Sequence, residues 1–145
     1  MPLSEDSAIA AVLERTRIVA LVGASDRPDR PSHRVMQVLQ RHGYRVIPVN
    51  PQLAGQVLLG ETVVAALADI AVPIDLVDVF RNAEAASAIV DEAIAIGAKA
   101  VWMQLGVINT AAAARAEAAG LRVVMDRCPA IEIPRLGVSP VVSGG

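Results

Sequence analysis

Short apolar runs alternate with helical patterns along this sequence, and the alternation limits the fold more than any other feature. A continuous apolar run typical of a buried strand occupies residues 18–23, and further strands are predicted at 45–49, 75–80, 100–103 and 121–125. Between them, apolar residues recur at helical spacing over 32–42, 83–97 and 109–120, and a short helix is predicted near 63–67. Strands separated by helices pair in parallel through right-handed crossovers, so we predict a three-layer, doubly wound α/β fold with a five-stranded parallel sheet.

We predict the strand order 3-2-1-4-5, numbering the strands along the chain. Asn82 and Asn109 precede helical patterns and are predicted N-caps. Residues 5–15 have apolar side chains at helical spacing and are expected to form an additional N-terminal helix, whereas 138–145 are expected to form a flexible tail. With 145 residues, 54% of them hydrophobic, the whole chain 1–145 is predicted to form one domain.

Charge and composition exclude several classes of function. Thirteen basic and fifteen acidic residues give a net charge of -2, which does not drive binding to nucleic acid or to an anionic membrane. The start of the chain is acidic and no apolar run is long enough to span a membrane, so we predict a cytoplasmic protein. A single cysteine, Cys128, excludes internal disulfides and multi-cysteine metal sites, and the spacing of His33 and His42 predicts no metal site.

The loop at 23–32 is the most informative candidate site. In a doubly wound sheet, ligands bind outside the carboxyl ends of the strands, and this loop joins the first strand to a helix. Its free backbone amides can therefore face an anion. Arginines are concentrated there, and Arg30 is the preferred phosphate partner because its guanidinium offers a fixed fork of donors. The alternative is an ordinary proline-rich turn beside a solvated helix face.

Three other strand ends offer polar or aromatic groups. Asn50 can contact a base or ribose, or it can simply form a turn before a proline. Phe80 and Arg81 suit stacking on a base and contact with a phosphate, but core packing and a surface position explain them equally well. Gln104 is the polar group expected to face a ligand after the fourth strand, beside the first loop in the predicted order, whereas Trp102 is expected in the core.

The residues argue against a nicotinamide dinucleotide and identify no catalytic set. Only Gly23 matches the Gly-x-Gly-x-x-Gly pattern, since Ser25 occupies the place of the second glycine. The second strand ends in Asn50 where an acid would hold a ribose hydroxyl. Cys128 beside Arg127 is either a thiol of lowered pKa or a structural residue, and the apolar flanks favour the structural interpretation. An NAD(P)-binding oxidoreductase or redox sensor stays as the alternative function.

From about Ile18 to about Leu136, the order of these motifs resembles the small, single-domain CoA-binding protein family, which has a Rossmann-like fold. The matching segments are Val22–Ser25 with Arg30–Ser32, Gly43–Pro51, Val79–Arg81, Val101–Gly106 and Asp126–Cys128. The resemblance also extends to the CoA-binding lobe of nucleoside-diphosphate-forming acyl-CoA synthetases such as succinyl-CoA synthetase.

The resemblance implies a nucleotide-binding protein for CoA or acyl-CoA without catalysis of its own. It places the pyrophosphate near the first loop and the adenosine near the end of the second strand, with further contacts after the third and fourth strands. The implied CoA-binding residues are Gly23, Ala24, Ser25, Arg30, Ser32, Val49, Asn50, Pro51, Phe80, Arg81 and Gln104. A third hypothesis is an interaction protein, either a homodimer or a subunit that docks onto an acyl-CoA enzyme, because the alanine-rich helices are smooth enough to pack on a partner. Ordinary helix layers over the sheet explain these helices at least as well.

Overall fold

A five-stranded parallel sheet forms the centre of the molecule. The computed structural model describes residues 2–141, and every neighbouring pair of strands in the sheet is parallel. In spatial order the strands are β2 (Arg45–Val49), β1 (Ile18–Val22), β5 (Leu76–Val79), β6 (Ala100–Met103) and β7 (Arg122–Val124). The predicted α/β class and five-stranded parallel sheet are therefore confirmed.

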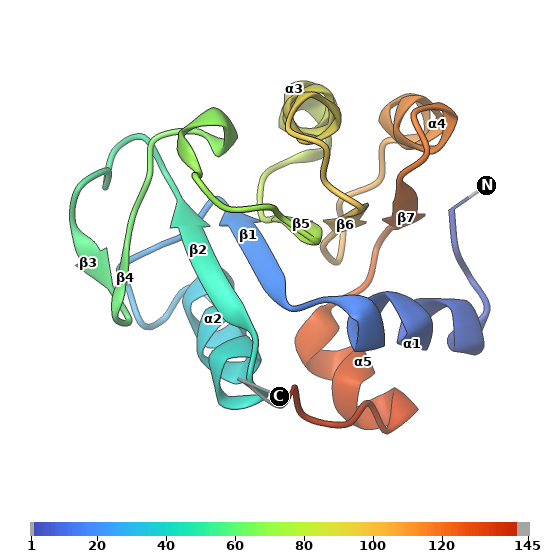
Figure 1. Cartoon of the computed structure of the whole chain (residues 1–145), viewed down its shortest axis with the longest axis horizontal. Helices are drawn as coiled ribbons and strands as arrows, with labels where there is room; N and C mark the ends of the chain where they lie inside the picture. The colour runs from blue at the N-terminus through green and yellow to red at the C-terminus, as the bar shows by residue number, and fades with distance from the viewer. Residues whose placement is uncertain (1, 142–145) are drawn as a thin grey trace.

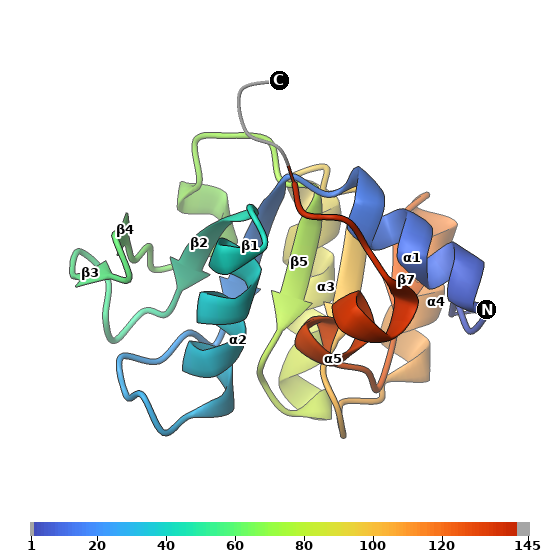
Figure 2. The same ribbon diagram turned by 90° about the horizontal axis from the view of Figure 1, so that it is seen from below.

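Helices cover both faces of the sheet and complete the three layers (Figure 1). One face is covered by α1 (Asp6–Arg15), α2 (Pro31–Arg41) and α5 (Pro129–Leu136), which lie in front of the strands in Figure 2. The other face is covered by α3 (Ala83–Ala95) and α4 (Thr110–Ala118). Side chains alternate along each strand, so Leu21 and Trp102 enter one apolar core and Val77 and Val101 enter the other.

The predicted strand order is wrong in one respect. The third strand along the chain, β5, lies between the first and fourth strands and not at the edge beyond the second. β1 has β2 on one side and β5 on the other, so the observed order is 2-1-3-4-5 in the numbering of the prediction. Both orders have buried parallel strands and right-handed crossovers, and local apolar patterns do not distinguish them. β5 consequently separates β6 from the first loop.

The expected helix near 63–67 is also wrong. Residues in this region form a short antiparallel pair, β3 (Val57–Leu58) with β4 (Glu61–Thr62), followed by the 3-10 turn η1 (Leu67–Asp69). Between β4 and η1 the chain is extended, because Val64 pairs with Val49 at the end of β2. This pairing satisfies backbone groups at the sheet edge, which overrides a weak local preference for helix.

The C-terminal part is more ordered than predicted. No helix was predicted at 129–136, where the structure has α5 with Pro134 inside it. Residues 138–145 were expected to form a flexible tail, but Val138 is buried and the Val141 amide donates to the His42 carbonyl at 2.8 Å. A Cβ atom at Gly43 would overlap the Val141 carbonyl, so this close approach requires a glycine. The remaining residues of the expected tail, 142–145, lie outside the described residues.

Helix ends and the N-terminal helix agree with the sequence. The Asn82 side chain accepts a hydrogen bond from the Ala85 amide at 2.7 Å, and Asn109 accepts one from the Ala112 amide at 3.0 Å. Both predicted N-caps are confirmed. The expected helix at 5–15 is observed as α1, and its predicted apolar stripe is buried. Local signals therefore located these elements well.

Candidate functional site

A cavity of about 890 Å³ opens at the carboxyl ends of β2, β1 and β5. Its walls come from the loops that follow these strands, the start of α2, one side of α3 and the segment after β4. Of the predicted CoA-binding residues, all except Gln104 line it: Gly23, Ala24, Ser25, Arg30, Ser32, Val49, Asn50, Pro51, Phe80 and Arg81. Three of the loops chosen from the sequence thus meet around one space.

The first turn after β1 depends on Gly23. This residue has φ of +93°, and a Cβ atom there would overlap the backbone carbonyl of Phe80 at the end of β5. The Gly23 amide donates to the Val49 carbonyl at 3.0 Å, while the Phe80 amide donates to the Val22 carbonyl at 2.8 Å. Gly23 therefore joins the ends of three strands at the floor of the cavity, and its glycine is needed by the fold itself.

Asn50 connects two of the loops. Its Nδ2 donates to the Ala24 carbonyl at 2.8 Å, and its Oδ1 accepts from the Gln52 amide at 2.8 Å. Asn50 is thus a turn former that also fixes the loop after β2 to the loop after β1. Ser25 is a turn residue as well, because its Oγ accepts a hydrogen bond from the Arg27 amide at 3.1 Å. These contacts hold the rim of the cavity in shape.

The N-terminal end of α2 provides the cavity with positive potential. Arg30 occupies the N-cap position and Pro31 follows it, and within the described residues no side chain caps this end and no acid lies in its first turn. Pro31 has no amide hydrogen and the His33 amide donates to the Arg30 carbonyl at 3.1 Å, so the Ser32 amide is the one in this first turn that is free to bind an anion within the described residues. The Arg30 side chain is exposed and forms no ion pair with any residue in 2–141. Its guanidinium is therefore available to a ligand.

The lining combines charges of both signs with apolar surface. Three arginines and two acids line it, namely Arg27, Arg30, Arg81, Asp26 and Glu92. Arg27 lies 3.7 Å from Asp29 in an exposed ion pair. The apolar part includes residues that the sequence analysis missed, and these are Leu53, Ala65, Ala66, Ala85, Ala88 and Ile89. The apolar spacing over 83–97 predicts a helix, but its periodicity does not show that one edge of α3 faces a cavity.

Gln104 lies outside this cavity. It is buried, and its Nε2 donates to Oδ1 of Asp78 at 2.8 Å. Asp78 lies within β5, is fully buried, and has no partner for Oδ2 among the described residues. Burial raises the pKa of Asp78 from its ordinary 3.8 to about 7, and the Gln104 hydrogen bond opposes part of that rise. The signal for this pair in the sequence is a lone acid in an otherwise apolar strand.

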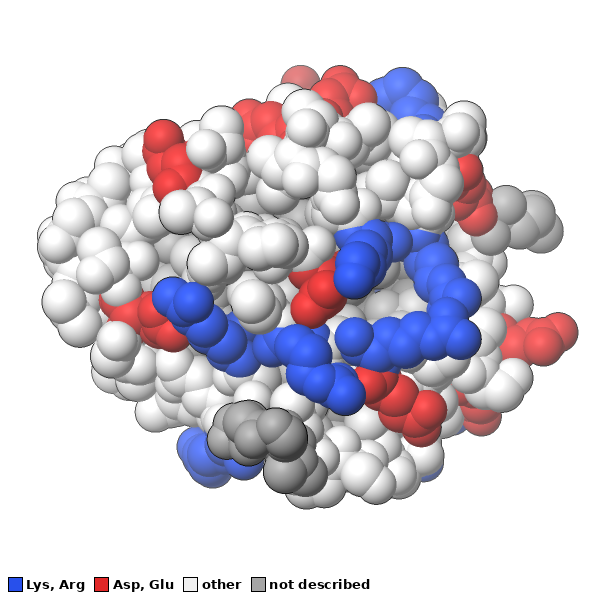
Figure 3. Space-filling model, in the orientation of Figure 1, with Lys and Arg blue, Asp and Glu red and all other residues white. Residues whose placement is uncertain are grey.

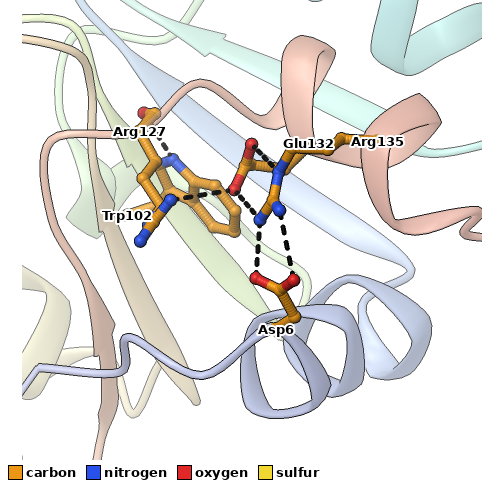
Figure 4. A network of polar contacts seen from close by, with 5 residues as sticks. All are labelled: Asp6, Trp102, Arg127, Glu132 and Arg135. Atoms are coloured by element: carbon orange, nitrogen blue, oxygen red, sulfur yellow. Dashed lines mark hydrogen bonds and ion pairs between the residues drawn. The ribbon is translucent and has the colours of Figure 1, made fainter.

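Hydrogen bonds and ion pairs close the neighbouring part of the same sheet edge, after β6 and β7. Asp126 Oδ1 accepts from the Gly106 amide at 2.7 Å, which joins the two loops. Trp102 Nε1 donates to the Arg127 carbonyl at 2.8 Å, and Arg127 Nη1 lies 3.2 Å from Glu132 Oε1 (Figure 4). Side chains here bind one another and leave the loops 104–108 and 126–129 outside the cavity lining.

Arg135 extends this network to the N-terminal helix. Its guanidinium binds both carboxylate oxygens of Asp6, at 2.9 and 3.2 Å, and also binds Glu132 (Figure 4). These contacts with Arg135 lower the pKa of both Asp6 and Glu132. Burial raises the pKa of the Cys128 thiol, which supports the structural interpretation of this cysteine.

Among residues 2–141, no group of three or more histidine, cysteine, aspartate or glutamate side chains is arranged to hold a metal ion. In the same part of the chain, no helix is both long enough and apolar enough to cross a membrane.

Comparison with known proteins gives close relatives. The chain is 40% identical over 120 residues to a Bacillus subtilis (strain 168) protein described as "Uncharacterized protein YneT", covering 83% of this chain and 87% of that one. The solved structure of cell-free ID.343 from Thermus thermophilus has a TM-score of 0.87 and 38% identity, with 92% of this chain and 99% of that chain covered.

A larger enzyme shares the fold. The dinucleotide-forming acetyl-coenzyme A synthetase 1 of Ca. Korarchaeum cryptofilum matches with a TM-score of 0.68 and 20% identity, over 79% of this chain and 27% of that chain. The family model described as "CoA binding domain" matches residues 17–134. The sequence, its fold and this match agree, and the chain belongs to the CoA binding domain family.

Proposed function

We propose that this chain binds coenzyme A, free or acylated, in the cavity at the carboxyl ends of β2, β1 and β5. The observation that carries the proposal is the uncapped N-terminal end of α2, which opens with Arg30 onto a cavity of about 890 Å³. An anionic ligand of nucleotide type gains from both groups, because amides and a guanidinium fork bind phosphate oxygens. Membership in the CoA binding domain family supports coenzyme A as that ligand.

The proposed pyrophosphate position is the loop 23–32. Gly23 and Ala24 bring the backbone to the floor of the cavity, while Arg30 and Ser32 lie where α2 begins. Ser25 Oγ accepts a hydrogen bond within its own turn, which leaves the hydroxyl hydrogen free to donate to a phosphate oxygen. Phosphate recognition here then depends on the Ser32 amide at the start of α2 and on the Arg30 guanidinium.

We place the adenosine near Val49, Asn50 and Pro51. Phe80 and Arg81 then form the other wall of its site. Asn50 uses one Nδ2 hydrogen and one Oδ1 lone pair in the loop contacts, so one of each is left for a base or ribose. Phe80 is half-buried and Arg81 is exposed on the cavity wall. We propose that the chain is a single-domain cytoplasmic binding protein that carries out no reaction of its own.

Thermal unfolding with CoA, acetyl-CoA, NAD+ and NADP+ in parallel tests this function. A ligand at about 100 times its dissociation constant stabilises the folded state by about 2.7 kcal/mol. We expect a rise in Tm with CoA or acetyl-CoA and none with the nicotinamide dinucleotides. A rise only with NAD+ or NADP+, or with none of the four, would contradict the proposal.

Arg30→Ala tests the position of the phosphates, with Arg34→Ala as a matched control. Arg34 is an exposed arginine one turn further along α2 and does not line the cavity. Loss of charge-assisted hydrogen bonds worth about 1.5–3 kcal/mol predicts at least a tenfold weaker CoA affinity for Arg30→Ala. Isothermal titration should show an unchanged affinity for Arg34→Ala. Gly23 is unsuitable for this test, because any Cβ there collides with the Phe80 carbonyl.

A further inference from the structure

A second, smaller hollow lies at the opposite edge of the sheet, where the strands begin. It measures about 420 Å³ and forms where α1, α3 and α4 end and β6 and β7 start. Figure 3 looks onto this edge and shows basic side chains curving around a depression, with acidic atoms at its rim. The basic residues of its lining are Arg15, Lys99 and Arg122, and the acid is Asp75.

Asp75 is already engaged and leaves two of the cations unpaired. Its Oδ2 accepts hydrogen bonds from the amides of Arg17 and Ile18 at 2.9 and 3.0 Å, and its Oδ1 lies 3.4 Å from Lys99 Nζ. Neither Arg15 nor Arg122 forms an ion pair with a residue that the structure describes. Three cations and one carboxylate give the lining a net charge of +2, which suits a doubly charged anion.

Most of the remaining lining is apolar, and Thr16, the polar exception, donates its hydroxyl to the Val12 carbonyl at 2.7 Å. Besides two glycines, the apolar members are Val12, Ile94, Ala98, Ala100, Ala119 and Leu121. Apolar walls beneath a charged rim favour a ligand with an anionic head and an apolar body, because both parts then find matching surroundings. They also lower the local dielectric, which strengthens attraction between arginine and an anion.

Stabilisation of helix ends does not account for this arrangement by itself. Cations near a helix C-terminus complement its negative end, and Arg15 lies in the last turn of α1. Arg41 has the same position in the last turn of α2, at the same edge of the molecule, yet it lines neither this hollow nor the larger cavity. The position of Arg15, Lys99 and Arg122 around one hollow therefore needs an explanation besides the stabilisation of helix ends.

We propose that this hollow is a second ligand site, for a small phosphomonoester with an apolar substituent. A phosphomonoester carries a charge of about -1.5 to -2 at neutral pH and offers three acceptor oxygens. The guanidinium groups of Arg15 and Arg122 bind these oxygens, Lys99 adds a point charge, and the apolar substituent rests on Val12 and Leu121. The site is independent of the CoA cavity, which lies at the other end of the strands.

Hexyl phosphate, titrated into the full chain and followed by the NMR shifts of backbone amides, tests the proposal. We expect saturable shifts centred on residues 97–100 and 119–122, with tighter binding than for inorganic phosphate, hexanoate or hexanol. Arg122→Gln and Arg15→Gln should each weaken hexyl phosphate about tenfold, since each removes a charge-assisted contact. Arg41→Gln is the matched control and should leave the affinity unchanged.

Three results would overturn this second site. One is the absence of saturable shifts at 97–100 and 119–122. Another is an affinity for inorganic phosphate equal to that for hexyl phosphate, because the apolar walls would then contribute nothing. The third is an equal loss of affinity in Arg41→Gln and Arg122→Gln, which would show that general surface charge and not the hollow binds the anion.

Discussion

The two halves of the carboxyl edge of the sheet have the same arrangement of strand-to-helix connections, but only one of them contains the large cavity. After β1 and β5, the chain enters α2 and α3 on opposite faces, and after β6 and β7 it enters α4 and α5 on opposite faces. Diverging connections on neighbouring strands create a crevice in such sheets. The first pair leaves a cavity of about 890 Å³, whereas hydrogen bonds join the loops of the second pair.

Side chains decide which crevice stays open. In the closed half, Trp102 is fully buried, Asp126 holds the Gly106 amide, and Gln104 binds Asp78. In the open half, Gly23 removes a side chain from the floor, and Arg30 projects from the rim with no ion-pair partner in 2–141. A doubly wound topology therefore offers more than one position for a ligand, and the local chemistry selects among them.

Trp102→Ala should have the largest effect, because it empties the centre of the closed half. Replacement of a fully buried aromatic side chain by alanine costs about 3–5 kcal/mol, and this change also removes the hydrogen bond to the Arg127 carbonyl. Urea unfolding measures the loss. CoA affinity of the folded variant should stay as in the parent, and a cost below about 1 kcal/mol would contradict the assigned core role.

Asp78→Asn should change the pH dependence of stability. The pKa of Asp78 is about 7 in the folded state against 3.8 ordinarily, so the unfolded chain releases this proton first. The carboxyl therefore lowers the free energy of unfolding progressively as pH rises from about 4 to about 7, and the loss is complete above pH 7. Asparagine keeps the contact to Gln104 and cannot ionise. Chemical denaturation at several pH values should show that the free energy of unfolding of the variant rises relative to that of the parent as pH increases toward 8. A difference between the two proteins that does not change with pH would refute this assignment.

Glu132→Gln weakens the ionic network of the closed half. The carboxylate is buried and binds Arg127 and Arg135, so its neutralisation should cost about 1–3 kcal/mol at pH 7. Contact with Arg135 lowers the pKa of Glu132, so its stabilisation is present above about pH 4.5 and is lost as pH falls through the folded-state pKa. Chemical denaturation should show parent and variant converging in acid. A constant difference down to low pH would contradict the ionic origin.

Asn50→Ala has the smallest expected cost in stability and acts on the open half. It removes the hydrogen bonds to the Ala24 carbonyl and from the Gln52 amide, which are partly exposed, at about 1 kcal/mol. The loops after β1 and β2 then move independently, so CoA affinity should fall although the fold is kept. Gln52→Ala is the comparison variant, because it changes a neighbouring side chain at the rim but keeps the contacts of Asn50 with the Ala24 carbonyl and with the amide of residue 52. Calorimetry should show a larger loss of CoA affinity for Asn50→Ala than for Gln52→Ala. Equal affinities would remove the proposed role of Asn50.

Periodicity predicted the five strands of the parallel sheet and the helices α1 to α4, and contacts between distant residues decided the rest. The strands and the caps Asn82 and Asn109 have local signals in spacing and residue type. The neighbours of β5 have no such signal, and the wrong strand order placed Gln104 beside the first loop. α5 was missed because Pro134 breaks the helical pattern, although the described fold tolerates it near the end of a short helix.

Chain order also explains why most of the candidate site was predictable. The loops after β1, β2 and β5 follow strands with clear apolar runs, so their residues were found without the correct strand order. The apolar wall from α3 and the segment after β4 was missed, because a helical stripe is the same whether it faces a core or a cavity. The network of Asp6, Glu132 and Arg135 joins residues 129 positions apart and has no local signature.

The most direct test of the central claim is a map of backbone amide shifts during a CoA titration. The account predicts the largest changes at residues 23–25, 30–32, 49–52 and 80–81, with small changes at 104–108 and 126–129. Such a map would place the ligand in the open half of the carboxyl edge. Largest changes at 104–108 and 126–129 would place it in the closed half and would contradict the account.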